Sequence, residues 1–223
     1  CIGHRRLSII DLSEAGKQPM TSHCDRYIIA INGEIYNHLE LREQLERKEV
    51  NIQWKGHSDT ETLLAAISYW GIDEALRLSQ GMFALALWDK FKKKLVLARD
   101  RIGEKPLYWG WAGKHFIFGS ELKALRAHPD CSNEINKESL LQYFRYSYIP
   151  APYSIYKNIF KLEPGTILSV KESPPLIPPN KPIPSGECYE TISINRYWDL
   201  KDEIEYGRSH KIFDEKEAIL KLE

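Results

Sequence analysis

Residues 82–88 (MFALALW) restrict the possible folds of this chain more than any other segment. The run is apolar at both alternating sets of positions, so a strand formed by it carries apolar side chains on each face. A strand of this kind must be covered on both sides. We therefore expect it to lie in a layered core, with further secondary structure packed against each face.

Two helices are predicted before this strand by their capping residues. Asn37 is followed three residues later by Glu40, and Ser58 by Glu61, which is the spacing of a capping box at a helix N-terminus. Apolar residues follow each pair, and Gly71 stands where the second helix needs a C-terminal cap. Both helices are therefore expected to begin next to these polar residues.

Several short strands are predicted around the two helices. Residues 27–31 indicate one strand, and residues 94–98 indicate another that returns after a charged turn. Residues 106–111 and 115–118 alternate as a hairpin, with Ala112-Gly113 at its turn. Two helices accompanied by hairpins favour an α+β sandwich over alternating βαβ units.

A proline-rich segment interrupts this pattern. Six prolines lie within residues 174–184, and Gly186 follows them. Proline supplies no backbone N–H to a sheet ladder and breaks a helix interior, so we expect a linker or a long loop here. Residues 213–223 then resemble a helix that begins close to the end of the sequence.

Composition argues against two classes of protein. The 31 Lys and Arg residues balance the 31 Asp and Glu residues, whereas a nucleic-acid partner usually requires a basic surface. No apolar run approaches the roughly 20 residues of a membrane-spanning helix. The four cysteines form no CxxC pair, which indicates free thiols in a reducing compartment, here the cytoplasm.

Asn32 and Gly33 allow two interpretations. An Asn-Gly pair between apolar residues is the strongest short hairpin signal, so the first is a tight turn. The second is an oxyanion hole, in which the Asn32 amide and the Gly33 backbone N–H stabilise the developing charge of an acyl-transfer reaction. The residues alone leave both open and favour the turn.

Other polar residues give weaker signals. The pair Arg5 and Arg6 precedes an apolar stretch, and a guanidinium suits a carboxylate ligand. Asp59 falls in the first turn of a predicted helix, where it either favours the helix dipole or binds an ammonium group. The charges of residues 99–106 are interpreted as mutually satisfied turn charges. The histidines show no metal-ligand spacing, so no metal site is predicted.

Six segments, in this order, resemble the glutamine-dependent asparagine synthetases: GHRRLSIIDLS, NGEIYNHLELR, SDTETLL, GMFALALWD, LARDRIGEKPLY and GSELKAL. The resemblance covers most of residues 3–165. It implies an α+β fold of the N-terminal-nucleophile hydrolase type, a four-layer αββα sandwich that is incomplete at its N-terminus. It divides the chain into an amidotransferase domain (1–165), a proline-rich linker or loop (166–198) and the start of an ATP-dependent synthetase domain (199–223).

The resemblance also implies a site for glutamine, whose hydrolysis by an N-terminal cysteine supplies ammonia for the amidation of aspartate. Asn32 and Gly33 would form the oxyanion hole, Arg6 would bind the α-carboxylate, and Glu34 and Asp59 would hold the amino end. Four further residues would line the pocket: Leu7, Ser8, Ile9 and Ile10.

Two parts of such an enzyme are expected to be absent. In the family the nucleophile stands in Cys-Gly-Ile, some tens of residues before GHRRLS, whereas Cys1 almost adjoins that segment. We therefore expect no catalytic role for Cys1. The pyrophosphate-binding pattern Ser-Gly-Gly-x-Asp-Ser does not occur, so ATP and Mg²⁺ are expected on a synthetase domain in cis and no cofactor on this chain. The chain would then be an inactive fragment of a cytoplasmic enzyme, with a homodimer left open.

Two other functions remain open at this stage. One is an amidotransferase that acts on a different carboxylate, such as a surface polysaccharide precursor. The other is a non-catalytic module that retains the fold for binding or assembly. The synthetase domain would distinguish the first from an asparagine synthetase, and the residue at the position of the family's cysteine would identify the second.

Overall fold

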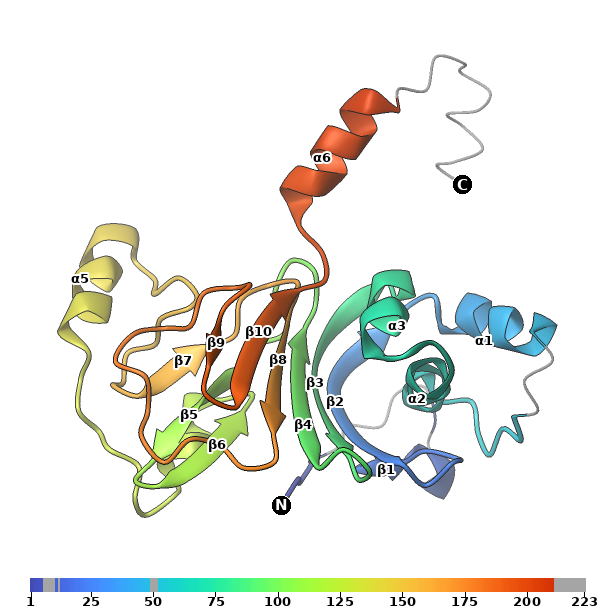
Figure 1. Cartoon of the computed structure of the whole chain (residues 1–223), viewed down its shortest axis with the longest axis horizontal. Helices are drawn as coiled ribbons and strands as arrows, with labels where there is room; N and C mark the ends of the chain where they lie inside the picture. The colour runs from blue at the N-terminus through green and yellow to red at the C-terminus, as the bar shows by residue number, and fades with distance from the viewer. Residues whose placement is uncertain (6–10, 12, 49–51, 211–223) are drawn as a thin grey trace.

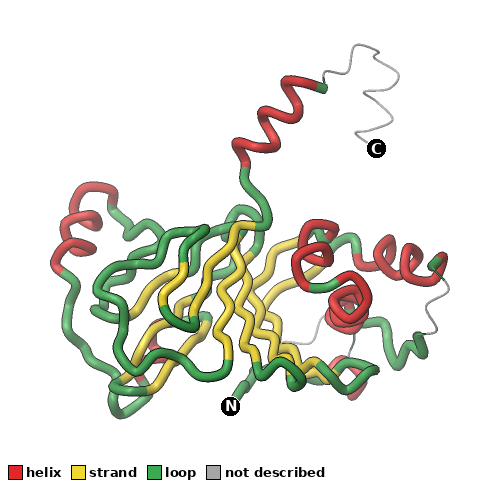
Figure 2. Tube along the Cα trace, viewed as in Figure 1, coloured by secondary structure: helices red, strands yellow, loops and turns green. Residues whose placement is uncertain are grey.

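Two antiparallel sheets lie face to face in the computed structural model, which describes residues 1–5, 11, 13–48 and 52–210 (Figures 1 and 2). In this described part, the first sheet has the strand order β1-β2-β3-β4-β8-β10-β9, and the second has the order β6-β5-β7. The strands of the first sheet are β1 (Met20–Thr21), β2 (Tyr27–Ile35), β3 (Gly81–Asp89), β4 (Lys94–Arg99), β8 (Thr166–Lys171), β9 (Cys188–Tyr189) and β10 (Ile192–Arg196). Those of the second are β5 (Tyr108–Ala112), β6 (His115–Gly119) and β7 (Ile159–Lys161).

The helices lie outside the two sheets. Figure 1 shows α1, α2 and α3 beside the first sheet and α5 beyond the second, while α6 extends away from both. No described helix is long and apolar enough to cross a membrane. The helical segments are η1 (a 3₁₀ turn, Glu14–Gly16), α1 (His38–Arg47), α2 (Asp59–Trp70), α3 (Ile72–Leu78), α4 (Leu122–Arg126), α5 (Lys137–Tyr146) and α6 (Leu200–Ser209).

Strand β3 is buried on both faces, as the sequence predicts. Phe83 and Leu85 belong to the core between the first sheet and its helices. Ala84 and Ala86 belong to the core between the two sheets, where Trp109 of β5 also lies. Burial of a large apolar side chain contributes about 1.5–3 kcal/mol, so β3 stabilises both interfaces. The predicted layered α+β sandwich is confirmed.

The turn interpretation of Asn32 and Gly33 is wrong, because strand β2 continues through both residues to Ile35. Gly33 lies opposite Phe83 in the pairing with β3. A Cβ at Gly33 would lie 2.0 Å from the carbonyl oxygen of Met82, so glycine is required by the close approach of the two strands. The Asn-Gly pair therefore occurs inside a ladder and not at its end.

The predicted helix starts are confirmed, but only in part by the predicted caps. The Ser58 hydroxyl accepts a hydrogen bond from the N–H of Thr60 at 3.1 Å, and Gly71 ends α2 with a φ of 83°. The Glu61 carboxylate accepts from two N–H groups of the preceding loop. Asn37 makes no side-chain cap bond. Its side-chain amide instead donates to the carbonyl of Leu78 and accepts from the N–H of Gln80, where α3 leads into β3.

The range 166–198 contains sheet strands as well as irregular chain. Strand β8 pairs with β4, and β10 pairs with β8, so the first sheet extends into the segment interpreted from sequence as a linker or long loop. The prolines lie between these strands, and the Trp111 indole donates to the carbonyl of Pro175 at 2.8 Å. The helix predicted at 213–223 lies outside the described residues.

Candidate functional site

Four of the predicted site residues line one cavity of about 200 Å³ beside strand β2: Asn32, Gly33, Glu34 and Asp59. Asn32, Gly33 and Glu34 are consecutive in β2, whereas Asp59 is the first residue of α2. The other predicted residues, 6–10, lie outside the described part of the chain. Their neighbours Arg5 and Asp11 line the same cavity.

The backbone N–H of Gly33 points to the edge of β2 that faces away from β3. Residues two apart in a strand direct their N–H groups to the same edge. The N–H of Ile31 donates to Gln18 Oε1 at 2.7 Å, and the N–H of Ile35 donates to Asp59 Oδ2 at 2.9 Å. The Gly33 N–H therefore lies on this edge between two occupied donors.

The other side of the ladder supports the same orientation. The N–H and the carbonyl of Phe83 are bonded to Asp100, at 3.2 Å and 2.8 Å, on the β4 side of β3. Phe83 is opposite Gly33, so this pair is of the non-hydrogen-bonded type, in which neither residue bonds the other. The Gly33 N–H is thus directed away from β3.

The Asn32 side chain is held by the second sheet. Its Nδ2 donates to the Ser120 hydroxyl oxygen at 3.2 Å, and Ser120 directly follows β6. A primary amide nitrogen carries two hydrogens, so one remains for another acceptor. Ser120 follows a strand of the second sheet, so the position of the Asn32 side chain is fixed by a contact between the sheets.

Asp59 is buried and already accepts hydrogen bonds from the backbone. Its Oδ1 accepts from the N–H of Thr60 at 2.8 Å, and its Oδ2 accepts from Ile35 across the gap to β2. The Thr60 hydroxyl also donates to Oδ1, at a longer distance of 3.4 Å. A carboxylate has about four lone-pair sites, so these three contacts leave capacity for a cationic ligand. The helix-start contact and a ligand-binding role are therefore compatible.

The loop of residues 100–105 brings a cation to the cavity. Asp100 is fully buried, and its two carboxylate oxygens accept from the N–H groups of Phe83, Gly103, Glu104 and Lys105. Lys105 lines the cavity. Burial lowers the pKa of the neighbouring Arg99, whose guanidinium donates to three backbone carbonyls. The charges at 99 and 100 are thus satisfied by backbone groups, which corrects the interpretation that turn charges satisfy one another.

Residues 1–175 match a family model described as a glutamine amidotransferase domain. The chain belongs to this family. One relative is a protein of Methanocaldococcus jannaschii that is provisionally named glutamine-hydrolysing asparagine synthetase 2. It is 42% identical over 178 residues, 73% of this chain. Asparagine synthetase 1 of Bacillus subtilis, also named as glutamine-hydrolysing, is 41% identical over 169 residues, 76% of this chain. The chain spans 33% and 26% of the lengths of these two relatives.

A solved structure supports the fold of this amidotransferase domain. The glutamine phosphoribosylpyrophosphate amidotransferase of B. subtilis superposes with a TM-score of 0.56 at 19% identity, covering 87% of this chain and 34% of that chain. At this identity the likeness concerns the fold alone. It agrees with the N-terminal-nucleophile hydrolase sandwich expected from the sequence.

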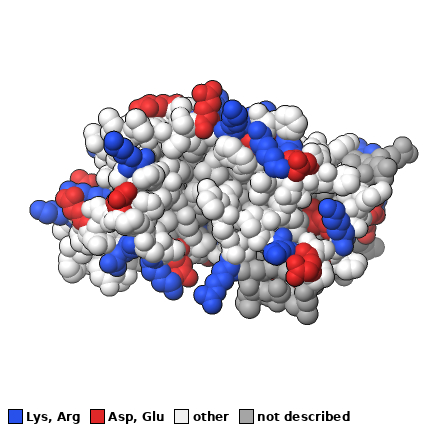
Figure 3. All heavy atoms as spheres, turned by 90° about the horizontal axis from the view of Figure 1, so that it is seen from below, with Lys and Arg blue, Asp and Glu red and all other residues white. Residues whose placement is uncertain are grey.

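Cys1 of the amidotransferase domain lies on a different cavity. That cavity has a volume of about 810 Å³ and is lined mainly by apolar residues, including Trp88 and Phe116 of the two sheets, with His115 and Lys114 among its polar lining residues. Cys1 is not among the described residues that line the cavity of Asn32. Figure 3 shows the molecule from the side on which the N-terminus lies in Figure 1, with charges of both signs around a largely uncharged centre.

Three residues of the amidotransferase domain support the site but were not predicted from sequence as site residues. They are Ser120, which holds Asn32, Asp100, which holds the loop of Lys105, and Asp11. The Asp11 carboxylate accepts from the N–H of His57 at 3.0 Å and from the N–H of Ser13 at 2.8 Å. It thereby joins the segment before β1 to the loop before α2. Only their occurrence in the quoted motifs marked these residues in the sequence.

Proposed function

We propose that this domain hydrolyses glutamine within a longer asparagine synthetase, and that the released ammonia amidates aspartate. The names of both relatives support this proposal, as do the six sequence segments that resemble the same enzymes. The family membership supplies the amidotransferase class. The amide acceptor is assigned from the relatives' names and from these segments.

One observation carries the proposal: Asn32 and Gly33 line the same cavity as Asp59, and the backbone N–H of Gly33 is directed away from β3. Attack of a thiolate on the glutamine amide carbon places negative charge on its carbonyl oxygen. Two fixed donors stabilise this oxygen more in the tetrahedral intermediate than in the substrate, which accelerates the reaction. We assign these donors to Asn32 and Gly33.

The charges around the cavity suit an amino acid. Glu34 and Asp59 offer carboxylates for the α-ammonium group, while Arg5 and Lys105 supply positive charge on the same cavity. A zwitterionic ligand needs both signs at separate positions. We assign the α-carboxylate to Arg6 and the pocket wall to residues 7–10, which stand in the sequence between the lining residues Arg5 and Asp11.

The remaining steps are assigned to other parts of the longer protein. The nucleophile is proposed to be a cysteine that precedes GHRRLS by some tens of residues, since Cys1 lies on the larger cavity. ATP and Mg²⁺ are proposed to bind a synthetase domain, since the Ser-Gly-Gly-x-Asp-Ser pattern does not occur in these 223 residues. The four free cysteines suit the reducing cytoplasm.

The test is the glutaminase turnover of the full-length protein with Asn32→Ala. Removal of one oxyanion-hole donor lowers kcat by about 10²–10³-fold, and KM should change little because the contact strengthens only in the transition state. Asn195→Ala, at an exposed position of β10, is the matched control and should retain wild-type turnover. An unchanged kcat in the Asn32→Ala protein would refute the assignment of Asn32 to an oxyanion hole.

A further inference from the structure

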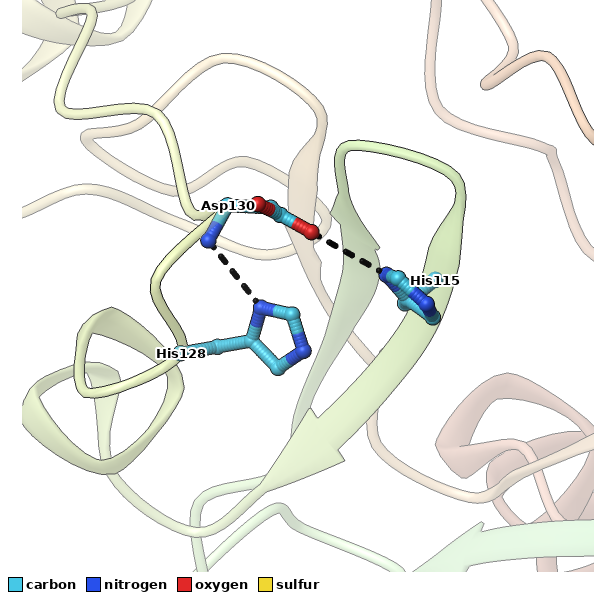
Figure 4. Close-up of side chains that lie close together, drawn as sticks. All are labelled: His115, His128 and Asp130. Carbon is cyan, nitrogen blue, oxygen red and sulfur yellow. Dashed lines mark hydrogen bonds and ion pairs between the residues drawn. The ribbon is translucent and has the colours of Figure 1, made fainter.

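We propose that His115, His128 and Asp130 form a binding site for a divalent transition metal of the zinc class (Figure 4). One ring nitrogen of each histidine and one carboxylate oxygen of Asp130 lie within 4.8 Å of one another. Imidazole nitrogen and carboxylate oxygen are the ligands that such metals accept in proteins. This donor set is separate from the cavity of Asn32, which none of the three residues lines.

Two segments that are distant in sequence bring these donors together. His115 is the first residue of β6, directly after the β5–β6 turn, whereas His128 and Asp130 follow α4. The turn and the loop are in close contact, since a Cβ at Gly113 would lie 3.1 Å from the Cβ of Asp130. The imidazole rings of the two histidines have centroids 5.1 Å apart. The backbone therefore holds all three side chains at one position.

The separation of two of the donor atoms suits tetrahedral coordination. The Nδ1 of His115 lies 3.4 Å from Oδ2 of Asp130. Ligand atoms at about 2.0–2.1 Å from zinc in a tetrahedral site are about 3.3–3.4 Å apart. This pair already has the required spacing, and the donor atom of His128 lies within 4.8 Å of both.

The third donor faces Asp130. The Nδ1 of His128 accepts a hydrogen bond from the backbone N–H of Asp130 at 3.2 Å (Figure 4). Metal binding would exchange this exposed hydrogen bond for a coordination bond. The side chains of His115 and Asp130 are 62% and 53% exposed, so water has access to the remaining coordination position. Three protein ligands and one water make a complete tetrahedral shell.

The experiment is a titration of the tag-free 223-residue chain with Co²⁺, whose visible absorption reports coordination, followed by competition with Zn²⁺. We expect one equivalent to bind in the wild-type chain. Loss of even an outer-shell partner lowers metal affinity roughly tenfold or more, so loss of a ligand in His128→Ala or Asp130→Asn should have at least that effect. Circular dichroism establishes whether each variant is folded. If His128→Ala does not fold, the less disruptive Asp130→Asn variant tests the site.

Two controls separate this site from other metal binding. His23→Ala removes an exposed histidine that is remote from the cluster in sequence, and it should leave the affinity unchanged. Cys131→Ser removes the thiol next to Asp130, and the affinity should again persist. The proposal is overturned if the wild-type chain binds no Co²⁺, or if the folded His128→Ala and Asp130→Asn variants bind as tightly as the wild type.

Discussion

Replacement of Asp100 by asparagine should destabilise the fold strongly, although the two side chains have nearly the same shape. Asp100 is fully buried, and its two oxygens accept four backbone hydrogen bonds. Asparagine has one amide oxygen in place of two carboxylate oxygens, and its NH₂ group would face two N–H donors. Two backbone donors would then lose their acceptors in a buried environment.

The magnitude follows from those two donors. Each buried donor left without a partner costs about 1–3 kcal/mol, so Asp100→Asn should lower the free energy of unfolding by about 2–6 kcal/mol. At a denaturant dependence of about 2 kcal/mol per molar in urea, the unfolding midpoint should fall by about 1–3 M. The loop of Lys105 should also lose its position on the cavity, since three of the four bonds hold residues 103–105.

The assay is urea unfolding of the 223-residue chain, followed by circular dichroism and tryptophan fluorescence. Asp25→Asn is the matched control, because it makes the same chemical change at a side chain that is 82% exposed and pairs with Lys90 on the surface. Exposed ion pairs contribute at most about 1 kcal/mol, so its midpoint should shift little. Equal shifts in Asp100→Asn and Asp25→Asn would refute the reasoning.

Two further predictions concern the orientation of Asn32 and the response to acid. Ser120→Ala in the full-length protein removes one hydrogen bond of about 0.5–1.5 kcal/mol and should lower glutaminase kcat about 2- to 10-fold, with KM unchanged. Ser120→Thr keeps the hydroxyl and should retain the wild-type turnover. Equal activity of the wild type and both variants would exclude a positioning role for Ser120. Burial alone would raise the pKa of Asp89, but the Arg26 guanidinium and two backbone N–H groups outweigh it and hold that pKa below its ordinary value. A carboxyl with a depressed folded-state pKa contributes stability above its unfolded pKa of about 3.9 and loses it as the pH falls through the folded value. As the pH falls below about 5, the wild-type chain should therefore lose more unfolding free energy than Asp89→Asn, and parallel acid curves would contradict this.

The sequence by itself determined the elements whose signals are local. The apolar character of residues 82–88 on both faces required layers on each side, and β3 has them. Ser58 and Gly71 marked the two ends of α2, because a helix end needs a cap whatever lies around it. The motif segments also identified the candidate site, and four of its residues line one cavity.

Only the tertiary structure decided how residues distant in the chain are paired. The local signal of Asn32 and Gly33 is a turn, but pairing with β3 keeps both in a strand and directs the Gly33 N–H outward. The range 166–198 has a proline-rich composition, yet β8 and β10 complete the first sheet by pairing with β4 and with each other. Strand pairing is a contact between distant segments, so it has no signature within either segment alone.

The side-chain clusters depended on tertiary structure in the same way. His115 and His128 have no metal-ligand spacing in the sequence, and they approach because the β5–β6 turn contacts the loop after α4. Ser120 reaches Asn32 only because the two sheets stack. Local sequence specifies which residues can form a helix, a strand or a hydrogen bond, whereas packing of the layers determines which of them meet, since burial of the apolar faces supplies the dominant free energy.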